Sequence, residues 1–206
     1  MSLICSTESV LELGVPRETA DRIVAWTHTL ARWQKAQRLV GWRRSHDLLQ
    51  QGIADALAAA PLLADLPDGP WLDLGSGSGL PALLLAAHYP ERELHLVEAR
   101  RKRCAFLRAA VVDMGLEHVR VHHGRAEDLI TEAHRPHPVL LSARAFVPPE
   151  QLPAHADAWG VQHLLVSSSR ARLPKGGWPE PWVLHVEHPG RPVGERLHLL
   201  LRRAAD

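Results

Sequence analysis

Residues 71–98 read WLDLGSGSGLPALLLAAHYPERELHLVE, and their pattern decides the fold. An apolar run at 71–74 breaks into three glycines at alternate positions, and apolar residues at helical spacing follow them. A second apolar run at 94–97 ends in the acid Glu98. The stretch therefore predicts a strand, a tight turn, a helix and a neighbouring strand.

The glycines at 75, 77 and 79 lack side chains where the backbone must turn sharply and approach a ligand closely. The helix start that follows them presents unpaired N–H groups. Glu98, which comes 23 residues after Gly75, can accept hydrogen bonds from two ribose hydroxyls. We therefore predict a nucleoside at this turn. The alternative is a glycine-rich turn that joins a strand to a helix and binds nothing.

The composition suits one α/β domain with an extension. The chain has 206 residues, of which 46% are hydrophobic and 23% charged, as is ordinary for a globular protein. Lys and Arg number 24 against 23 Asp and Glu, so the net charge is only +1. Any binding of nucleic acid must then use a local basic patch rather than bulk charge.

The cysteines, the N-terminus and the histidines disfavour several classes of protein. Cys5 and Cys104 do not form a disulfide framework, and we expect both to be reduced in the cytoplasm. The N-terminus lacks the features of a signal peptide, and no stretch reaches the roughly 18 apolar residues of a membrane span. The 14 histidines are scattered without other ligands at metal-binding spacing, so we expect no metal. We also expect a monomer.

Hydrophobic periodicity predicts alternating helices and strands. Ser45 is the expected N-cap of the second helix, Pro61 is its expected stop, and Gly115 is a C-cap further along. We expect helices over residues 19–39, 45–60, 80–87, 100–114 and 151–159, and strands over residues 71–74, 94–97, 119–121, 139–141, 161–166, 182–186 and 197–201.

This alternation predicts an α/β fold: an open, mostly parallel sheet with helices on both faces and a ligand at its carboxyl edge. A turn cluster, Pro-Asp-Gly-Pro at 67–70, precedes the glycine-rich unit. We therefore place an N-terminal helical extension at residues 1–66 and the main domain at residues 67–206.

Several segments carry a resemblance to known proteins. The spacing D-x-G-x-G-x-G at 73–79 departs from the G-x-G-x-x-G of dinucleotide sites and resembles the first motif of class I S-adenosylmethionine (SAM) methyltransferases. The further segments, in order, are WQK at 33–35, KRCAFL at 102–107, GRAED at 124–128, SARA at 142–145 and GERLH at 194–198. With them, most of the chain resembles the bacterial methyltransferases that act on N7 of a guanine in small-subunit (16S) ribosomal RNA. That family is also called glucose-inhibited division protein B.

The resemblance implies the Rossmann-like fold of class I SAM methyltransferases, with SAM as the cofactor. Glu98 would bind the ribose, Ala126 and Glu127 would flank the adenine, and Arg144 would pair with the carboxylate at the methionine end. A structural salt bridge is the alternative role for Arg144. The cofactor-binding residues implied are Asp73, Gly75, Ser76, Gly77, Gly79, Leu80, Glu98, Ala126, Glu127 and Arg144.

Basic residues near the N-terminus and at the start of the 100–114 helix are candidate RNA contacts. Cations are misplaced at a helix start, where the dipole is already positive, which indicates either a solvated face or an anionic partner. The resemblance implies small-subunit ribosomal RNA or the 30S subunit as that partner. The candidate RNA-binding residues are Arg38, Arg43, Arg44, Arg101, Lys102 and Arg103.

The implied reaction needs no catalytic acid or base, because guanine N7 has a free lone pair and no proton to lose. The chain departs from the family at 38–40, where Asn-Leu-Thr is typical, and at 52–56, where His-x-x-Asp-Ser is typical. It also lacks the usual Lys-Gly near 167–170, so Arg170 is the candidate replacement for that lysine. These changes fall on the RNA side. They leave open a non-catalytic SAM- or RNA-binding relative and a small-molecule methyltransferase, whereas the glycine spacing disfavours a nicotinamide oxidoreductase.

Overall fold

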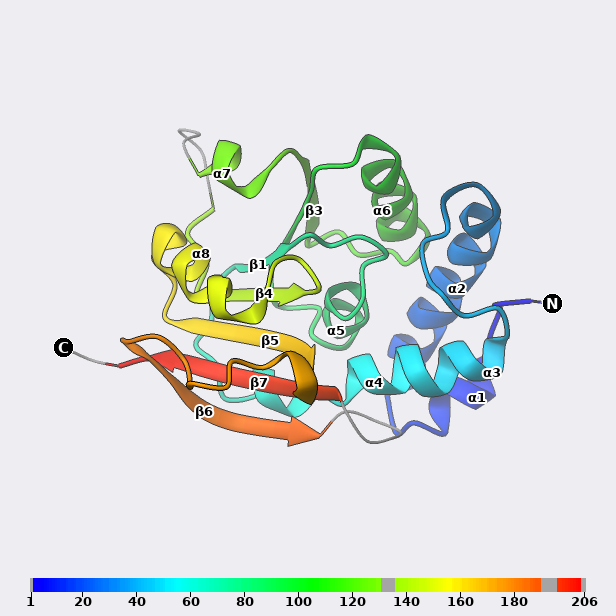
Figure 1. Cartoon of the computed structure of the whole chain (residues 1–206). Coiled ribbons are helices and arrows are strands. Elements are labelled where there is room, and N and C mark those ends of the chain that lie inside the picture. The colour runs from blue at the N-terminus through cyan, green and yellow to red at the C-terminus, as the bar shows by residue number, and fades with distance from the viewer. Residues whose placement is uncertain (1, 131–135, 190–195, 205–206) are drawn as a thin grey trace.

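The computed structural model describes residues 2–130, 136–189 and 196–204, which hold one sheet of seven strands (Figure 1). The strands are β1 Trp71–Leu74, β2 Leu94–Glu98, β3 Val119–His123, β4 Leu140–Arg144, β5 His163–Ser169, β6 Trp182–Pro189 and β7 Arg196–Arg203. Their order is β3-β2-β1-β4-β5-β7-β6. Neighbours among β1 to β5 pair in parallel, while β7 runs antiparallel to both β5 and β6. The predicted open, mostly parallel sheet is confirmed.

Helices flank this sheet. In the described ranges they are α1 Thr7–Leu11, α2 Arg17–Gln37, α3 Ser45–Leu48, α4 Ala54–Leu57, α5 Ala82–His88, α6 Arg101–Asp113, α7 Ala126–Leu129 and α8 Leu152–Trp159. In Figure 1, α1 to α4 lie to the right of the sheet, beyond the tips of β4 and β5, and α7 and α8 lie to its left. None of these helices is long and apolar enough to cross a membrane.

Alternation along the central strands sends side chains into two separate cores. On β5, Leu165 joins the core shared with α2, α5 and α6, while Leu164 and Val166 join the core beside α7 and α8. Strand β1 divides in the same way, with Trp71 in the first core and Leu72 in the second. Because both faces are covered, the parallel strands read as apolar runs in the sequence.

The stretch 45–60 differs from the single helix expected. Ser45 is the first residue of α3, and its N-cap is Arg44, which makes no side-chain capping bond. A π-helix, Leu49–Ile53, separates α3 from α4, and Pro61 lies in a 3-10 turn, Ala60–Leu63. A π turn adds a residue to the helical register. The apolar spacing therefore reads as one helix although the backbone changes its winding.

The N-terminal helices pack directly on the rest of the molecule. Trp26 of α2, which is fully buried, donates from Nε1 to the Ser78 carbonyl in the glycine turn at 3.1 Å. Thr29 and Arg32 of the same helix both donate to the Asp113 carboxylate on α6. Residues of the expected extension thus support the glycine turn, and a domain boundary between residues 66 and 67 stays a prediction.

Leu165→Ala should lower the free energy of unfolding by about 2–5 kcal/mol, because Leu165 is fully buried in a central strand and its truncation leaves a cavity. The matched control is Val183→Ala on the edge strand β6, where the side chain is 52% exposed and the change should stay within about 0.5 kcal/mol. Urea unfolding followed by circular dichroism measures both variants. Equal losses would contradict the assignment of the core.

Candidate functional site

The glycine turn follows β1, at the point where the strand order reverses between β1 and β4. Open α/β sheets bind their ligands at such a switch point. Gly75 and Gly77 have φ angles of +69° and +57°, a region that L side chains rarely adopt. A Cβ on Gly75 would lie 2.7 Å from Phe146 Cδ2, whereas the nearest atom to a Cβ on Gly77 is Arg103 Nη1 at 3.6 Å. A side chain at Gly75 would therefore clash with Phe146, whereas one at Gly77 would meet only ordinary contacts, and both glycines have the positive φ that the turn requires.

Glu98 ends β2 and faces this turn. Its Oε2 accepts a hydrogen bond from Gly77 N at 3.0 Å, and its Oε1 accepts one from Arg100 N at 2.8 Å. Arg103 Nη1 lies 3.8 Å from the same carboxylate, which is only 5% exposed as a residue. The acid therefore ties the tip of β2 to the glycine turn, and a bound ribose would have to share or replace these donors.

A cavity of 540 Å³, named here the turn cavity, opens against the glycine turn. It is lined by residues 75–78 and 80, by residues 39–42, and by Arg103, Arg144, Ala145 and Arg196. Among these lining residues Trp42 is the one aromatic side chain. Of the ten predicted cofactor residues, the turn cavity is lined by Gly75, Ser76, Gly77, Leu80 and Arg144 but not by Asp73, Gly79, Glu98, Ala126 or Glu127.

Asp73 lies beneath the turn, in the central strand β1. Its Oδ1 accepts a hydrogen bond from Ser142 Oγ at 2.5 Å, and that hydroxyl accepts one from Trp71 Nε1 at 2.7 Å. Burial raises the pKa of the Asp73 carboxyl to about 7, since hydrogen bonds from Ser142 and Ser76 offset only part of the lost hydration and the Glu98 charge adds to the rise. Asp73 therefore supports the turn from below instead of lining the cavity.

Ala126 and Glu127 lie at the start of α7, a short helix that the periodicity does not predict. Gly124 N, just before it, donates to the Glu98 carbonyl at 3.2 Å, which holds this segment against the tip of β2. Ala126 is buried and Glu127 is exposed. The predicted adenine pair is thus placed one strand beyond Glu98, outside the turn cavity.

Arg144 ends β4 and belongs to a cluster of charges that also contains Asp55, Arg196 and His198. The buried Asp55 carboxylate accepts a hydrogen bond from Arg196 Nη1 at 2.8 Å. It also lies 3.7 Å from Arg144 Nη1 and 3.5 Å from His198 Nε2. Arg144 Nη1 is buried and has no hydrogen-bond partner in the part of the chain that the structure describes. This nitrogen is therefore paired with Asp55 at ion-pair distance without a hydrogen bond.

Burial and neighbouring charges shift the pKa values of Arg144 and Asp55 in this cluster. Burial lowers the pKa of Arg144 to about 10, and Arg196 adds to the fall while Asp55 opposes it, so Arg144 remains charged at neutral pH. Burial also acts to raise the pKa of Asp55, but the neighbouring His198 and Arg196 outweigh it and hold that pKa below its ordinary range. Sequence reasoning missed Asp55 and Arg196 as site residues. Two signals were available: Arg196 belongs to the GERLH segment, and Asp55 is an acid in an otherwise apolar stretch.

The predicted RNA-binding residues divide between two cavities and the open surface. Arg103 lines the turn cavity, while Arg38 and Arg43 line an adjoining cavity of 860 Å³ beside α2. The other three candidates, Arg44, Arg101 and Lys102, are exposed.

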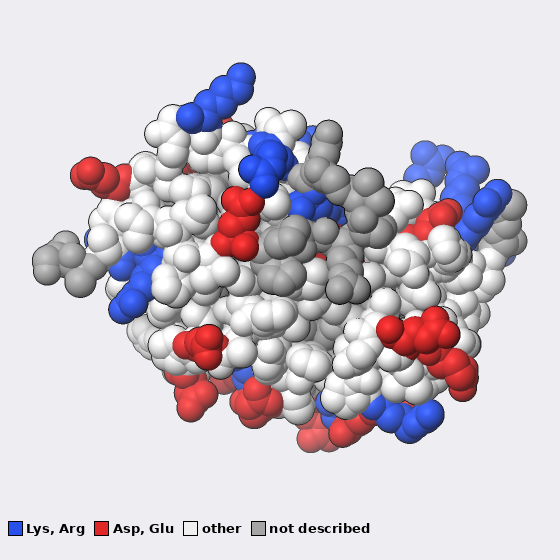
Figure 2. Space-filling view, turned by 90° about the horizontal axis from the view of Figure 1, so that it is seen from below, with Lys and Arg blue, Asp and Glu red and all other residues white. Residues whose placement is uncertain are grey.

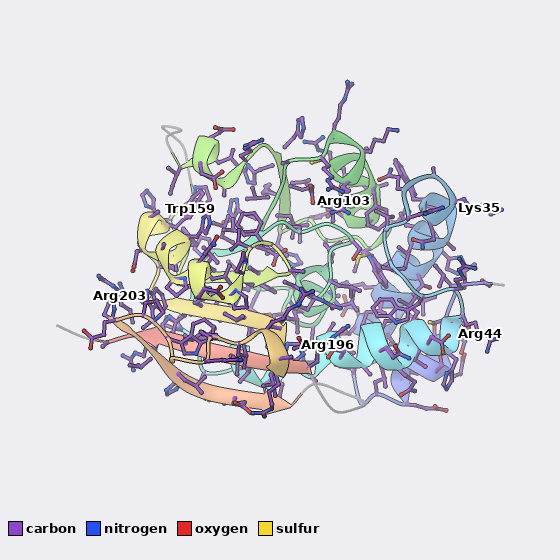
Figure 3. All side chains as sticks on the ribbon, in the orientation of Figure 1. Lys35, Arg44, Arg103, Trp159, Arg196 and Arg203 are labelled. Atoms are coloured by element: carbon purple, nitrogen blue, oxygen red, sulfur yellow. The ribbon has the colours of Figure 1, made fainter. Side chains whose placement is uncertain are left out.

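Figures 2 and 3 show where some of the charged residues lie. Figure 3 shows Arg44 at the outer edge of the N-terminal helices and Arg196 near the middle of the molecule, between β7 and α4. On the face seen in Figure 2, basic and acidic residues are interspersed among neutral ones. That face therefore carries no continuous basic surface in its described part.

Arg170, the predicted replacement for a lysine, is not brought to the turn cavity. It belongs to the 3-10 turn Arg170–Arg172, and its Nη2 donates to Glu187 Oε1 on β6 at 2.7 Å. Arg172 of the same turn lines a different cavity, next to Arg144. Gly194 and Glu195 of the GERLH segment lie outside the described residues.

Comparison with known proteins gives relatives over most of the chain. The family model described as "GidB: rRNA small subunit methyltransferase G" matches residues 19–170. A ribosomal RNA small subunit methyltransferase G from Ralstonia nicotianae is 31% identical over 218 residues, covering 96% of this chain and 96% of that protein. A relative of the same description from Methylorubrum populi is 36% identical over 85% of this chain and 80% of its own length. The chain spans only 58% of the length of the relatives from Sphingopyxis alaskensis and Methylobacillus flagellatus.

Solved structures of low sequence identity share the fold. A putative methyltransferase from Escherichia coli, yhhF, superposes with a TM-score of 0.57 at 19% identity, covering 74% of this chain and 86% of that chain. MtNAS in complex with MTA and tNA also gives a TM-score of 0.57, at 14% identity over 92% of this chain and 76% of that chain. A point mutant of MtNAS, with a TM-score of 0.55, was solved in complex with S-adenosylmethionine. The predicted class I methyltransferase fold is confirmed.

Asp73→Asn should remove a pH dependence of folding stability. The folded-state pKa of about 7 exceeds the roughly 3.9 of an unfolded aspartate, so the folded protein binds the extra proton between these values. The stabilising contribution of the protonated acid is full below about pH 4 and is lost as the pH rises through 7. Urea unfolding at pH 5 and pH 8 should show wild type losing stability relative to the variant. A stability difference that is the same at both pH values would contradict the raised pKa.

Proposed function

We propose from one premise, that the chain belongs to the rRNA small subunit methyltransferase G family. On that premise the chain transfers a methyl group from SAM to N7 of a guanine in small-subunit ribosomal RNA. The observation that carries the proposal is the glycine turn at the switch point, with Gly77 at positive φ and Glu98 facing it. This combination offers a bare backbone and a carboxylate to a nucleoside. In the bacterial cytoplasm the protein would act on free small-subunit RNA or on the 30S subunit.

The residues around the turn fit SAM. A Cβ at Gly77 would meet only ordinary contacts, and Arg144, which lines the turn cavity, can receive a carboxylate from the methionine end of the cofactor. We assign Glu98 to the ribose hydroxyls, and Ala126 and Glu127 to the two sides of the adenine. The fit rests on the chemistry of these groups: a carboxylate for hydroxyls and a buried guanidinium for an acid.

Methyl transfer asks little acid–base chemistry of the chain. Bound SAM supplies an electrophilic methyl group on its sulfonium. Guanine N7 has a lone pair and no proton to lose, so no residue has to act as an acid or a base. The protein contributes alignment, which can lower a barrier by about 7–11 kcal/mol, and exclusion of water. Val40, Trp42 and Leu80 line the turn cavity and give it an apolar wall for that purpose.

The N-terminal helical extension would guide RNA toward this cavity. Residues 39–42 line both the turn cavity and the 860 Å³ cavity beside α2, so the two spaces meet at this segment. Arg38 and Arg43 supply positive charge to the outer cavity. Trp42 lies at the junction and offers an indole on which a base can stack.

Methylation with tritiated SAM tests the proposed function. Unmodified small-subunit RNA and 30S subunits, prepared from cells lacking the native activity, are incubated with the purified protein. Label should enter the RNA in at least one preparation, and chemical cleavage at 7-methylguanine should map it to a single guanine. If the protein binds SAM but labels neither preparation, the assignment of the substrate is wrong and that of the cofactor stands. If the protein does not bind SAM, both assignments are wrong.

Glu98→Gln should weaken SAM binding about tenfold, or about 1.4 kcal/mol, because an amide is a poorer acceptor for ribose hydroxyls than a carboxylate. The matched control is His123→Gln, at the position paired with Glu98 on β3, which should keep the Kd within about twofold of wild type. Isothermal titration calorimetry measures both variants, and their melting curves check the fold. Equal affinities would contradict the role of Glu98.

A further inference from the structure

A third cavity, of 730 Å³, adjoins the turn cavity and shares Arg144, Ala145 and Arg196 with it. We name it the serine cavity, because Ser167, Ser168 and Ser169 at the end of β5 line it. None of the glycine-turn residues lines it. The two cavities therefore meet at a pair of arginines, and the assignment of SAM to one leaves the other without a ligand.

Three guanidinium groups from three separate elements border the serine cavity. Arg144 comes from β4, Arg196 from β7, and Arg172 from the 3-10 turn after β5. Against these three positive charges stand Glu150, which lines the same cavity, and Asp55, which is bonded to Arg196. These three arginines and two carboxylates together give the cavity a net charge of +1.

Hydroxyl donors lie beside these charges. Ser167 Oγ is 2.8 Å from His198 Nδ1, which fixes that side chain, and Ser168 and Ser169 are half-buried along the same strand end. Guanidinium and hydroxyl groups that converge on one space are the groups with which proteins hold phosphate oxygens.

We propose that the serine cavity binds a phosphodiester of the RNA strand, beside the nucleotide that is methylated. The inference rests on the proposed function and adds to it a second, phosphate-holding site. Because Arg144 and Arg196 border both cavities, a phosphate held there lies next to the place assigned to the methionine end of SAM. Phosphate contacts set the position of a nucleic acid without reading its sequence. The serine cavity therefore fixes how far the target strand enters.

Arg172 and Arg170 form a matched pair for testing this site. They lie two residues apart in one 3-10 turn, and both are exposed. Arg172 lines the serine cavity, whereas the Arg170 guanidinium is held by Glu187 on β6 and does not line it. Substitution of either by glutamine removes one positive charge from the surface. A difference between the two variants therefore reports the cavity and not the net charge.

RNA affinity is measured for wild type, Arg172→Gln and Arg170→Gln over a series of salt concentrations. Arg172→Gln should bind a small-subunit RNA fragment about five- to tenfold more weakly at low salt, and its plot of log affinity against log salt should be shallower by about 0.7–0.9. Arg170→Gln should stay within about twofold of wild type with an unchanged slope. The SAM affinity of both variants, measured by calorimetry, should equal that of wild type.

Ser168→Glu is a second variant that does not remove an arginine. A carboxylate in the cavity should repel phosphate and weaken RNA binding more than about tenfold, while SAM binding is kept. Inorganic phosphate distinguishes the RNA backbone from a free anion as the ligand. If inorganic phosphate weakens RNA binding no more than a neutral salt of equal ionic strength does, a phosphodiester site is supported. If inorganic phosphate itself binds saturably, and Arg172→Gln loses that binding while its RNA affinity is unchanged, the phosphodiester site is overturned.

The outcomes separate this inference from the proposed function. If wild type methylates RNA and Arg172→Gln behaves like Arg170→Gln, the phosphate site is wrong and the proposed function stands. If wild type neither binds SAM nor labels RNA, the proposed function fails by itself.

Discussion

The hydrogen bond that Gly77 N donates to the Glu98 carboxylate is the interaction on which the site depends. The turn has few side chains with which to hold its own shape, so other parts of the chain must hold it. Glu98 binds Gly77 N, the Val97 carbonyl accepts from Gly75 N at 2.9 Å, and Trp26 of α2 binds the Ser78 carbonyl. A strand on one side and an N-terminal helix on the other therefore constrain the same short loop, and the extension is part of the site's framework.

The sheet and the glycine turn could be predicted because their signals are local. Apolar runs bounded by turns mark the strands, and alternate glycines mark a bend, whatever the rest of the chain does. The charge cluster could not be predicted in this way, because Asp55 meets Arg196 across 141 positions of sequence. A similar limit applies to Arg170. A basic residue after β5 was anticipated, but the 3-10 turn directs Arg172 to a cavity and leaves Arg170 with Glu187.

One departure from the family pattern has a structural counterpart in this chain. Gly52 stands where the resemblance described in the sequence analysis predicts a histidine, and a Cβ at Gly52 would lie 3.0 Å from Trp42 Cζ3. Trp42 also donates from Nε1 to Gln51 Oε1 at 3.2 Å. The indole thus packs against the π-helix where a larger residue at position 52 would have to displace it. The glycine at position 52 is therefore matched to the place that the Trp42 indole occupies in this structure.

The hydrogen bond between Asp55 and Arg196 has a consequence for how the protein is made. Synthesis runs from the N-terminus, so α4 leaves the ribosome long before the last strand exists. Until that strand is added, Asp55 lacks its hydrogen-bonded counter-ion, and burying an acid without one is costly. Copies that stop short of residue 196 would therefore dock α4 poorly. Cellular proteases could then distinguish such fragments from finished chains.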